Sequence, residues 1–519
     1  ARPDRPYRPR LRRLDDELVR GFLEIQRAEN ASRHGPNGNP ALWTGEMIFS
    51  IISLMIRDFA PVQERLVVAE ARLESICRLL DPPREPGAVG AEGEGFAVAA
   101  FDVEPPAPLG PLDPRTPVPR AWSEKAVRDC EGAAVLLSTG FEHWLGSVEH
   151  ASADVGRVRR AADRARARLG MLAARARAHR EAPESAMACG PDLFDLLLTR
   201  GHYSTRSRAD LLTDARERFE AAKSELELLA RAVAGSWSDA QGQLAADCPS
   251  PNEYYGAFGA TWQACHARAG EADVVSWPDW PIRYVPYPPW TADAAPYLYY
   301  LFYRSPAPFD PYTVYDYVVP PLPVDEAERE KHLRAWNRST IKLNHVVHHG
   351  AIGHHVQNWY AYNQPRSRVG QVAAVDCANR IGMFCGGTMA EGWACYATDL
   401  MEEIGFLTPL ERVSQQHTRV RMLARAIADI ELHQGTMSFS DCVRFYAEQV
   451  GMSAEAARAE AVKNSMYPCT AIMYWLGTQG IHDLRDEMKR REGARFSLRR
   501  FHGQLLGFGS IPVPLVTRM

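Results

Sequence analysis

The sequence predicts a mainly α-helical protein with a small irregular or β-containing insertion rich in proline and aromatic residues. Two observations carry this prediction. Apolar residues recur at helical spacing over residues 11–80, 120–235 and 334–507. Residues 248–333 instead concentrate proline and aromatic side chains, and proline at high density disfavours long helices. With 519 residues, the chain is long enough to bury a large core.

Residues 1–80 are predicted to form N-terminal helices, because their apolar positions alternate with charged ones every three or four residues. The first apolar stripe consists of Leu14, Leu18, Phe22 and Ile25. Asn39 and Pro40 mark a turn between two of these helices. Residues 81–119 contain many glycines and prolines, which indicates an extended connection or an exposed loop.

Residues 120–247 are predicted to be helical, with two or three long amphipathic helices. The clearest runs from Asp210 to Ala234 and carries Leu211, Ala215 and Phe219 on one stripe. The basic stretch from Arg157 to Arg180 is expected to be the solvated face of a helix rather than an RNA-binding face.

Residues 248–333 are expected to form short strands, turns and ordered loops. Their aromatic side chains could wrap the helical body or wall a substrate pocket, and both roles stay open. The residues concerned include Trp277, Trp280, Tyr284 and Trp290. Residues 334–519 are predicted to form a further helical region, which contains the candidate metal-binding and catalytic motifs. We expect all segments to pack as one integrated domain.

Composition excludes several classes of protein. A hydrophobic content of 46% and a charged content of 24% are ordinary for a soluble globular protein. The net charge of −4 gives no global field for nucleic acid, and no apolar run is long enough to span a membrane. The ten cysteines include no CxxC pair and do not form a disulfide framework, so most should be reduced and buried.

We expect the protein to bind a small-molecule substrate and to bind neither nucleic acid nor a membrane. Whether it forms a homodimer stays open. No signal peptide is visible, which favours a cytoplasmic location. A removed leader stays open because the chain begins at Ala1 without methionine.

Five of the sixteen histidines lie within eleven residues, a density that packing alone does not explain. They are His345, His348, His349, His354 and His355. Imidazole is a common metal ligand, and two on one helical face can share an ion. On a regular helix, His345 and His349 are i, i+4 neighbours, the spacing of zinc-binding helices.

Other pairs in the cluster need a distorted helix. His354 could approach His348 only if the helix deforms between them. Gly350 and Gly353 are the residues that would permit such a bend.

A metal site needs ligands beyond one helix, and Glu391 is the best candidate. It opens an amphipathic helix that continues through Leu400, so a first-turn acid favoured by the helix dipole is the alternative. Asp429 and His433 form a second i, i+4 pair, in which the carboxylate could orient the imidazole behind a ligand. A helix-surface ion pair is the alternative there.

At these residues the sequence resembles DUF885, a bacterial family of unassigned function that is related to the HExxH-type metallopeptidase superfamily. The family motifs read roughly His-Glu-x-x-Pro-Gly-His, Glu-Gly-Trp-Ala-x-Tyr-Ala and Asp-x-x-x-His, followed by two carboxy-terminal motifs. Over about 335–515 this chain has the same order and spacing, in His348–His354, Glu391–Ala397, Asp429–His433, Pro468–Gly477 and Phe501–Pro512. The resemblance implies a large helical metallopeptidase-like fold.

By position, the resemblance implies His348, His354 and Glu391 as ligands of one divalent transition metal, with zinc favoured over iron. Regular helix geometry alone would instead pair His345 with His349. We follow the family pattern for the ligands, and additional ligation by His345, His349 or the neighbouring His355 stays open.

The resemblance also implies Tyr474 as an oxyanion stabiliser and His433 as a polar residue of the pocket. The chain departs from the family at the expected general base, a glutamate that is His349 here. It departs again at Ile352, where the family has proline, and at Cys469, where it has glycine. A neutral imidazole could take a proton from water near pH 7, or become a further ligand.

The sequence therefore predicts a metal-dependent, hydrolase-like enzyme that acts on a small molecule. The preferred reaction is hydrolysis of an amide-type bond by a metal-activated water, with His349 as a non-standard base. Arg304, Arg338 or Arg425 could bind a substrate carboxylate. One alternative is non-haem iron oxidative or lyase chemistry at a His/Glu site. The other is a non-catalytic binding protein with a degenerate peptidase motif.

Overall fold

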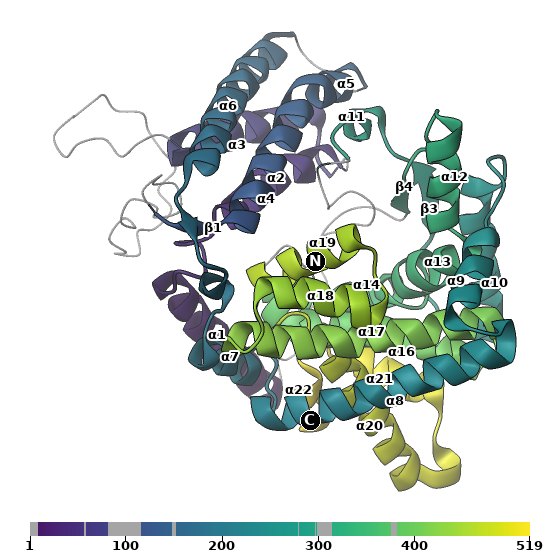
Figure 1. Cartoon of the computed structure of the whole chain (residues 1–519). Helices are drawn as coiled ribbons and strands as arrows, with labels where there is room; N and C mark the ends of the chain where they lie inside the picture. The colour runs from purple at the N-terminus through teal and green to yellow at the C-terminus, as the bar shows by residue number, and fades with distance from the viewer. Residues whose placement is uncertain are drawn as a thin grey trace. The chain divides into compact units, whose positions relative to one another are not determined.

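The computed structural model describes residues 9–56, 59–80, 116–147, 152–278, 280–295, 297, 314–374 and 381–519. Helices dominate these residues (Figure 1). The strands among them form two parallel pairs, β1 with β2 and β3 with β4. The predicted mainly α-helical fold is therefore confirmed.

The chain divides into two compact units, whereas we expected one integrated domain. The smaller unit comprises Glu29–Ala186 and Pro288–Tyr299, and the larger comprises Ala1–Ala28, Met187–Tyr287 and Tyr300–Met519. Helical spacing shows which face of each helix is apolar, but not which helices share a core. The division therefore could not be predicted from periodicity.

The smaller unit consists mainly of four helices that pack on one another, α2, α3, α4 and α6. Its elements are α2 (Pro40–Met55), α3 (Val62–Leu80), β1 (Val118–Pro119), α4 (Arg120–Val135), η2 (Leu136–Gly140), α5 (Phe141–Gly146), α6 (Ser152–Ala178), β2 (Glu181–Ala182), η3 (Glu184–Met187) and α11 (Pro289–Ala292). Of the predicted connection at 81–119, residues 81–115 lie outside the described residues, and β1 follows them.

The arginine-rich stretch of the smaller unit forms the exposed side of α6, as predicted. Four of its arginines pair with glutamates of neighbouring helices, in Arg157–Glu70, Arg159–Glu142, Arg164–Glu74 and Arg177–Glu131. Every partner keeps a third or more of its side chain exposed except Glu70, at 29%. Such solvated pairs contribute little stability individually.

The larger unit carries the motifs. Its first part contains α1 (Pro9–Ala31), α7 (Pro191–Leu196), η4 (Leu197–Gly201), α8 (Arg208–Ala234), α9 (Trp237–Ala246), α10 (Tyr254–Glu271), β3 (Ile282–Pro286), β4 (Tyr315–Val319), α12 (Glu326–Ala335) and α13 (Arg338–Thr340). Its second part contains η5 (Ile341–Gly350), α14 (His354–Asn363), α15 (Arg368–Val372), η6 (Gly382–Gly386), α16 (Gly387–Glu403), α17 (Pro409–Gln434), α18 (Phe439–Val450), α19 (Ala454–Met466), α20 (Met473–Glu492), η7 (Gly493–Arg495), α21 (Leu498–Leu506) and α22 (Val513–Thr517).

The segment 248–333 differs in part from its prediction. It contains a long helix, α10, because its prolines cluster before and after residues 254–271 and leave that stretch free of them. The expected β structure is present as β3 and β4, in which Tyr284 is the register partner of Tyr317. The insertion therefore combines a regular helix with the predicted strands.

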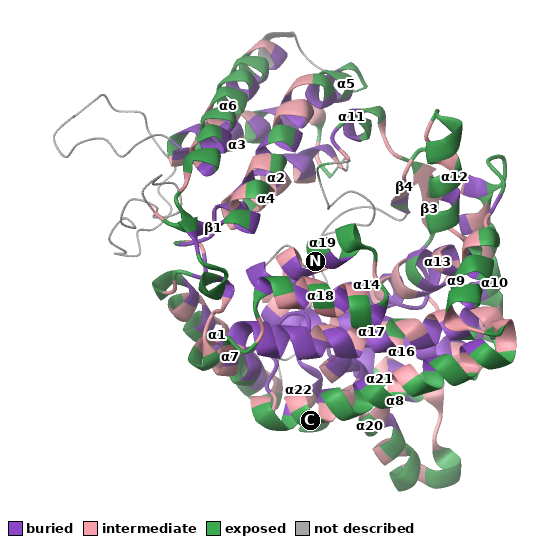
Figure 2. Ribbon diagram, viewed as in Figure 1, coloured by how far each residue is buried: buried purple, intermediate pink, exposed green. Residues whose placement is uncertain are grey.

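Helix α16, which carries Glu391, is almost entirely buried (Figure 2). It packs chiefly against α20, while α8 runs alongside α17 (Figure 1). Where α16 crosses α20, a Cβ added to Gly392 would lie 2.5 Å from the Cα of Gly477. Only glycine permits such a backbone contact, so the two glycines fix the register of both helices and place Glu391 and Tyr474 near the crossing.

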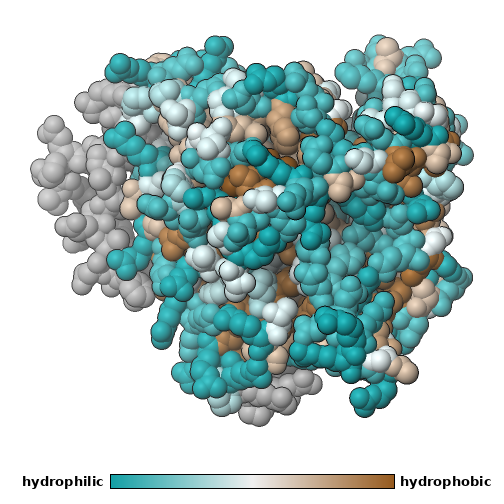
Figure 3. Space-filling model, turned by 60° about the horizontal axis from the view of Figure 1, so that its bottom comes forward, coloured by the Kyte–Doolittle hydropathy of each residue, from teal (hydrophilic) through white to brown (hydrophobic). Residues whose placement is uncertain are grey.

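None of the described helices is both long and apolar enough to cross a membrane. The face of the molecule drawn in Figure 3 is mainly hydrophilic, with hydrophobic residues in small separate groups. No disulfide joins the nine described cysteines, and six of these are buried, in line with the prediction.

Buried histidines outside the cluster connect distant segments of the larger unit. His202 donates from Nε2 to the Cys469 carbonyl at 2.5 Å, and His502 donates from Nδ1 to the Val274 carbonyl at 2.6 Å. Burial lowers the pKa of each imidazole to about 4. Both are therefore neutral hydrogen-bond donors at neutral pH.

These two histidines predict an acid-sensitive fold. Between pH 6.5 and about 4 the unfolded chain holds protons on His202 and His502 that the folded chain does not. Stability should therefore rise with pH through this window, by about 1.4 kcal/mol per pH unit for each histidine. Urea unfolding of the chelator-treated protein at intervals from pH 4.5 to 8 measures the slope, with pH 7 to 8 as the control range. A constant midpoint throughout would contradict the prediction.

Candidate metal centre

A chain reversal between η5 and α14 positions the histidines of the cluster. The Gly353 N–H donates to the Val347 carbonyl at 2.9 Å and closes the reversal. Gly353 has φ −74° and ψ −120°, and a Cβ there would collide with the carbonyl of His348. A Cβ at Gly350 would likewise collide with the hydroxyl of Tyr284. The predicted bend at these two glycines, without which His354 could not approach His348, is therefore present.

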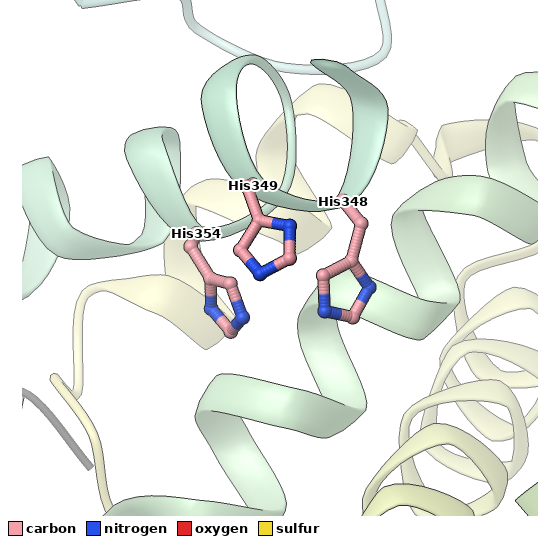
Figure 4. A group of neighbouring side chains, drawn as sticks. All are labelled: His348, His349 and His354. Atoms are coloured by element: carbon pink, nitrogen blue, oxygen red, sulfur yellow. The ribbon is translucent and has the colours of Figure 1, made fainter. Parts of the chain in front are cut away.

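The imidazoles of His348, His349 and His354 point toward one another (Figure 4). One ring nitrogen of each lies within 4.8 Å of one from each of the other two. The Glu391 Oε2 atom, from α16, lies 3.5 Å from Nε2 of both His348 and His354. The side chains of these two histidines and Glu391 are only 11–14% exposed. The reversal and α16 thus assemble three imidazoles and a carboxylate in a nearly buried site.

Burial and mutual contact determine the charge of these groups. Burial lowers the pKa of His348 below its ordinary value and that of His349 well below it. Burial by itself would raise the pKa of Glu391, but His354 and His348 hold it well below its ordinary value. Neutral imidazoles and an ionised carboxylate are the states in which these side chains bind metal ions.

A backbone hydrogen bond orients His349. Its Nδ1 lies 2.7 Å from the Asn344 carbonyl. A carbonyl oxygen only accepts hydrogen bonds, so Nδ1 carries the proton and Nε2 of the neutral ring keeps its lone pair. His349 can therefore act at Nε2 either as a base or as a metal ligand.

The donor set fits a transition-metal ion. Two atoms bound tetrahedrally to zinc, each about 2.1 Å away, lie about 3.4 Å from each other. The separation of 3.5 Å between Glu391 Oε2 and the Nε2 atoms of His348 and His354 agrees with this spacing. Imidazole and carboxylate ligands suit zinc and non-haem iron alike.

The DUF885 family, described as a bacterial protein of unknown function, matches residues 113–519. The chain belongs to this family. The match covers every motif discussed above.

Two solved structures are similar to this DUF885 member. One is a "putative lipoprotein of unknown function" from Shewanella oneidensis, with 17% identity, a TM-score of 0.65, and coverage of 92% of this chain and 82% of the other. The other is a "putative lipoprotein" from Colwellia psychrerythraea, with 17% identity, a TM-score of 0.60, and coverage of 77% and 70%. These likenesses show a shared fold. No protein of curated function matches the chain.

Of the five clustered histidines, His345 does not join the group formed by His348, His349 and His354. Its Nδ1 shares a hydrogen bond of 2.6 Å with the Tyr317 hydroxyl, and its ring stacks on Trp336 with centroids 4.1 Å apart. The rings of His345 and His349 are 6.4 Å apart. Because Tyr317 and Trp336 hold the His345 ring, the structure does not group it with the imidazoles of His348, His349 and His354.

His355 and His433 also bind backbone groups instead of the cluster. His355 donates from Nε2 to the Trp280 carbonyl at 2.5 Å. His433 is fully buried. Its Nε2 donates to the Asn464 carbonyl at 2.9 Å, and its Nδ1 accepts the Cys189 N–H at 3.3 Å. Both ring nitrogens of His433 therefore bind backbone groups, and its role as a polar residue of the pocket stays a prediction.

Asp429 holds the turn that precedes α20. Its carboxylate accepts the N–H groups of Cys469 at 2.9 Å and Ile472 at 3.0 Å, while His433 Nε2 is 3.8 Å away. Cys469 has a φ of 60°, which explains why glycine suits this position in the family pattern. The predicted orientation of His433 by Asp429 is thus secondary to this turn.

Tyr474 follows this turn, on the first residues of α20, and its oxyanion role stays a prediction. The Arg425 guanidinium lies 5.3 Å from its ring centroid. Both Glu460 oxygens bind Arg425, at 2.8 and 2.7 Å, so this arginine is already paired. Arg338 is exposed and pairs with Glu253. Arg304 lies outside the described residues.

Two contacts of the site were not predicted. The Asn344 carbonyl that orients His349 is a backbone group, which any residue supplies, so no side-chain signal existed. Trp393 donates from Nε1 to the carbonyls of Ile352 and Gly353, at 2.9 and 3.2 Å. Its place in the Glu-Gly-Trp-Ala motif was the available signal.

The reversal predicts a strong effect of Gly353→Ala. The new Cβ would collide with the His348 carbonyl, so the variant should lose about 1–3 kcal/mol of stability, the cost of overpacking, and bind zinc more weakly. Urea unfolding and zinc titration measure both effects. Gly256→Ala is the matched control, because a Cβ at Gly256 on α10 meets no atom within 4 Å. Equal behaviour of the two variants would refute the role of the reversal.

Proposed function

We propose that this DUF885 member is a mononuclear metal-dependent enzyme that hydrolyses an amide-type bond in a small molecule. The observation that carries the proposal is the convergence of three imidazoles and the Glu391 carboxylate from two separate segments of the chain. A distant relation to the HExxH metallopeptidases is part of the proposal, with His349 in the place of the usual glutamate base.

His348, His354 and Glu391 would hold the ion, since the carboxylate oxygen is 3.5 Å from both Nε2 atoms. A divalent transition metal, zinc in preference to iron, would supply Lewis acidity that polarises a carbonyl and lowers the pKa of water. The low exposure of the three side chains would keep bulk water from competing for the ligands.

His349 would act as the general base at Nε2. The Asn344 carbonyl holds the proton on Nδ1, so Nε2 can take a proton as the oxygen of water bonds to the amide carbon. The same carbonyl would stabilise the imidazolium that forms. When the carbon–nitrogen bond breaks, His349 would return the proton to the departing nitrogen. Tyr474 would donate a hydrogen bond to the carbonyl oxygen as its negative charge develops.

One observation favours a second candidate function. A nitrogen of His349 lies within 4.8 Å of those of His348 and His354, so the third imidazole could be a ligand in place of a base. Three imidazoles and one carboxylate would form a set suited to non-haem iron and to oxidative or lyase chemistry.

Metal content tests the ligand set. The wild-type protein should bind about one metal ion per chain, and His348→Ala and Glu391→Ala should each lose most of it, because each removes one ligand. Elemental analysis after purification measures occupancy. His143→Ala is the matched control, since His143 is an exposed histidine of the smaller unit.

Full occupancy in both variants would show that the ligand set is wrong. A wild-type protein that holds no metal, and whose thermal stability does not change on adding zinc or iron, would support a non-catalytic binding protein instead.

His349→Gln separates the two candidate functions. If His349 is the base, the variant should keep its metal and lose about 10²–10⁴-fold in hydrolysis of small amides, and His349→Glu should retain activity or gain it toward peptides. Assays on N-acyl amino acids and dipeptides, with metal analysis of each variant, measure these outcomes. Loss of metal in His349→Gln, together with iron and oxygen consumption in the wild type, would favour the iron enzyme.

A further inference from the structure

Helix α16 contacts the η5–α14 reversal at two places. Glu391 reaches the imidazoles of His348 and His354. Two residues later, Trp393 donates its indole N–H to the carbonyls of Ile352 and Gly353, at 2.9 and 3.2 Å. One helix thus supplies both the carboxylate of the site and the donor that holds the backbone of the reversal.

We propose that Trp393 is a positioning residue of the metal centre, which sets the separation of His348 and His354 by fixing the backbone between them. This inference rests on the proposed metal site and adds a residue that touches none of its ligand atoms. The effect of Trp393 would pass through the reversal to His354, which follows Gly353 directly in the chain.

The two carbonyls of the reversal depend on the Trp393 indole to different degrees. The Gly353 carbonyl also accepts the Gln357 N–H at 3.1 Å and so starts α14. The Ile352 carbonyl accepts a hydrogen bond from the Trp393 indole N–H at 2.9 Å, and Ile352 is fully buried. A buried carbonyl that loses its donor favours another backbone conformation. Removal of the indole N–H would therefore release the geometry that brings His354 back to His348.

The indole itself is held rigidly. Trp393 is fully buried. Its ring packs edge-on against His502 with centroids 5.1 Å apart, and Tyr396 lies 5.6 Å away. His502 is fixed in turn by the Val274 carbonyl. A rigid donor can define the positions of its acceptors, which is what positioning a metal ligand requires.

The test is a Co²⁺ titration of the metal-free full-length protein, followed by visible absorption. Trp393→Phe removes the N–H donor and keeps an aromatic ring. Incorporation of 3-benzothienylalanine at position 393 keeps the size and shape of the indole but replaces N–H by sulfur, so it covers the case in which Trp393→Phe does not fold. Each should bind Co²⁺ about 10–100-fold more weakly than the wild type, with altered intensity of the d–d bands.

Trp144→Phe is the control, because Trp144 is a buried tryptophan of the smaller unit. It should lower stability without changing the affinity for Co²⁺ or the spectrum. Wild-type affinity and spectrum in the benzothienylalanine protein would overturn the role of Trp393 and leave the metal site standing. Absence of Co²⁺ binding by the wild type would instead overturn the metal site on which the inference rests.

Discussion

The reversal at residues 351–353 is the constraint on which the candidate site depends. A Cβ at Gly353 would occupy the space of the His348 carbonyl, so the tight path exists only because this residue has no side chain. The reversal turns two histidines that are six positions apart into neighbours whose ring centroids are 4.9 Å apart. The rest of the local structure supports this path, through the Gly353–Val347 hydrogen bond and the indole of Trp393.

The histidines of the larger unit illustrate how partners determine roles. His202, His355, His433 and His502 each donate to a backbone carbonyl of a distant segment. A neutral imidazole satisfies such a carbonyl, so these residues join segments of the fold without any further group. In the cluster, His348 and His354 face another imidazole and a shared carboxylate. Burying several electron-pair donors together costs free energy, and a bound cation would offset this cost.

The helical regions, the cluster and Glu391 could all be predicted, because periodicity and motif order are local properties of the sequence. The π-helical form of η5 could not, since a spacing argument assumes 3.6 residues per turn, and distant side chains act on this segment. Tyr284 donates to the His345 carbonyl at 3.2 Å, and Trp262 donates to the Gly350 carbonyl at 2.9 Å. The hydrogen-bond partners of His433 could not be predicted either, because they are backbone groups far away in sequence.

In the proposed metal site, His349 in the place of a glutamate base would change the charge of the site as well as its base. A glutamate there would add a second carboxylate beside Glu391, and two carboxylates would balance the charge of a divalent ion. With an imidazole, the protein supplies one negative charge, and the occupied site would keep a net positive charge. In a nearly buried site such a charge acts strongly on its surroundings, so it would favour substrates whose reacting group is anionic or becomes anionic. The same positive charge would also oppose protonation of His349, which would favour its role as a ligand and make it a weaker base.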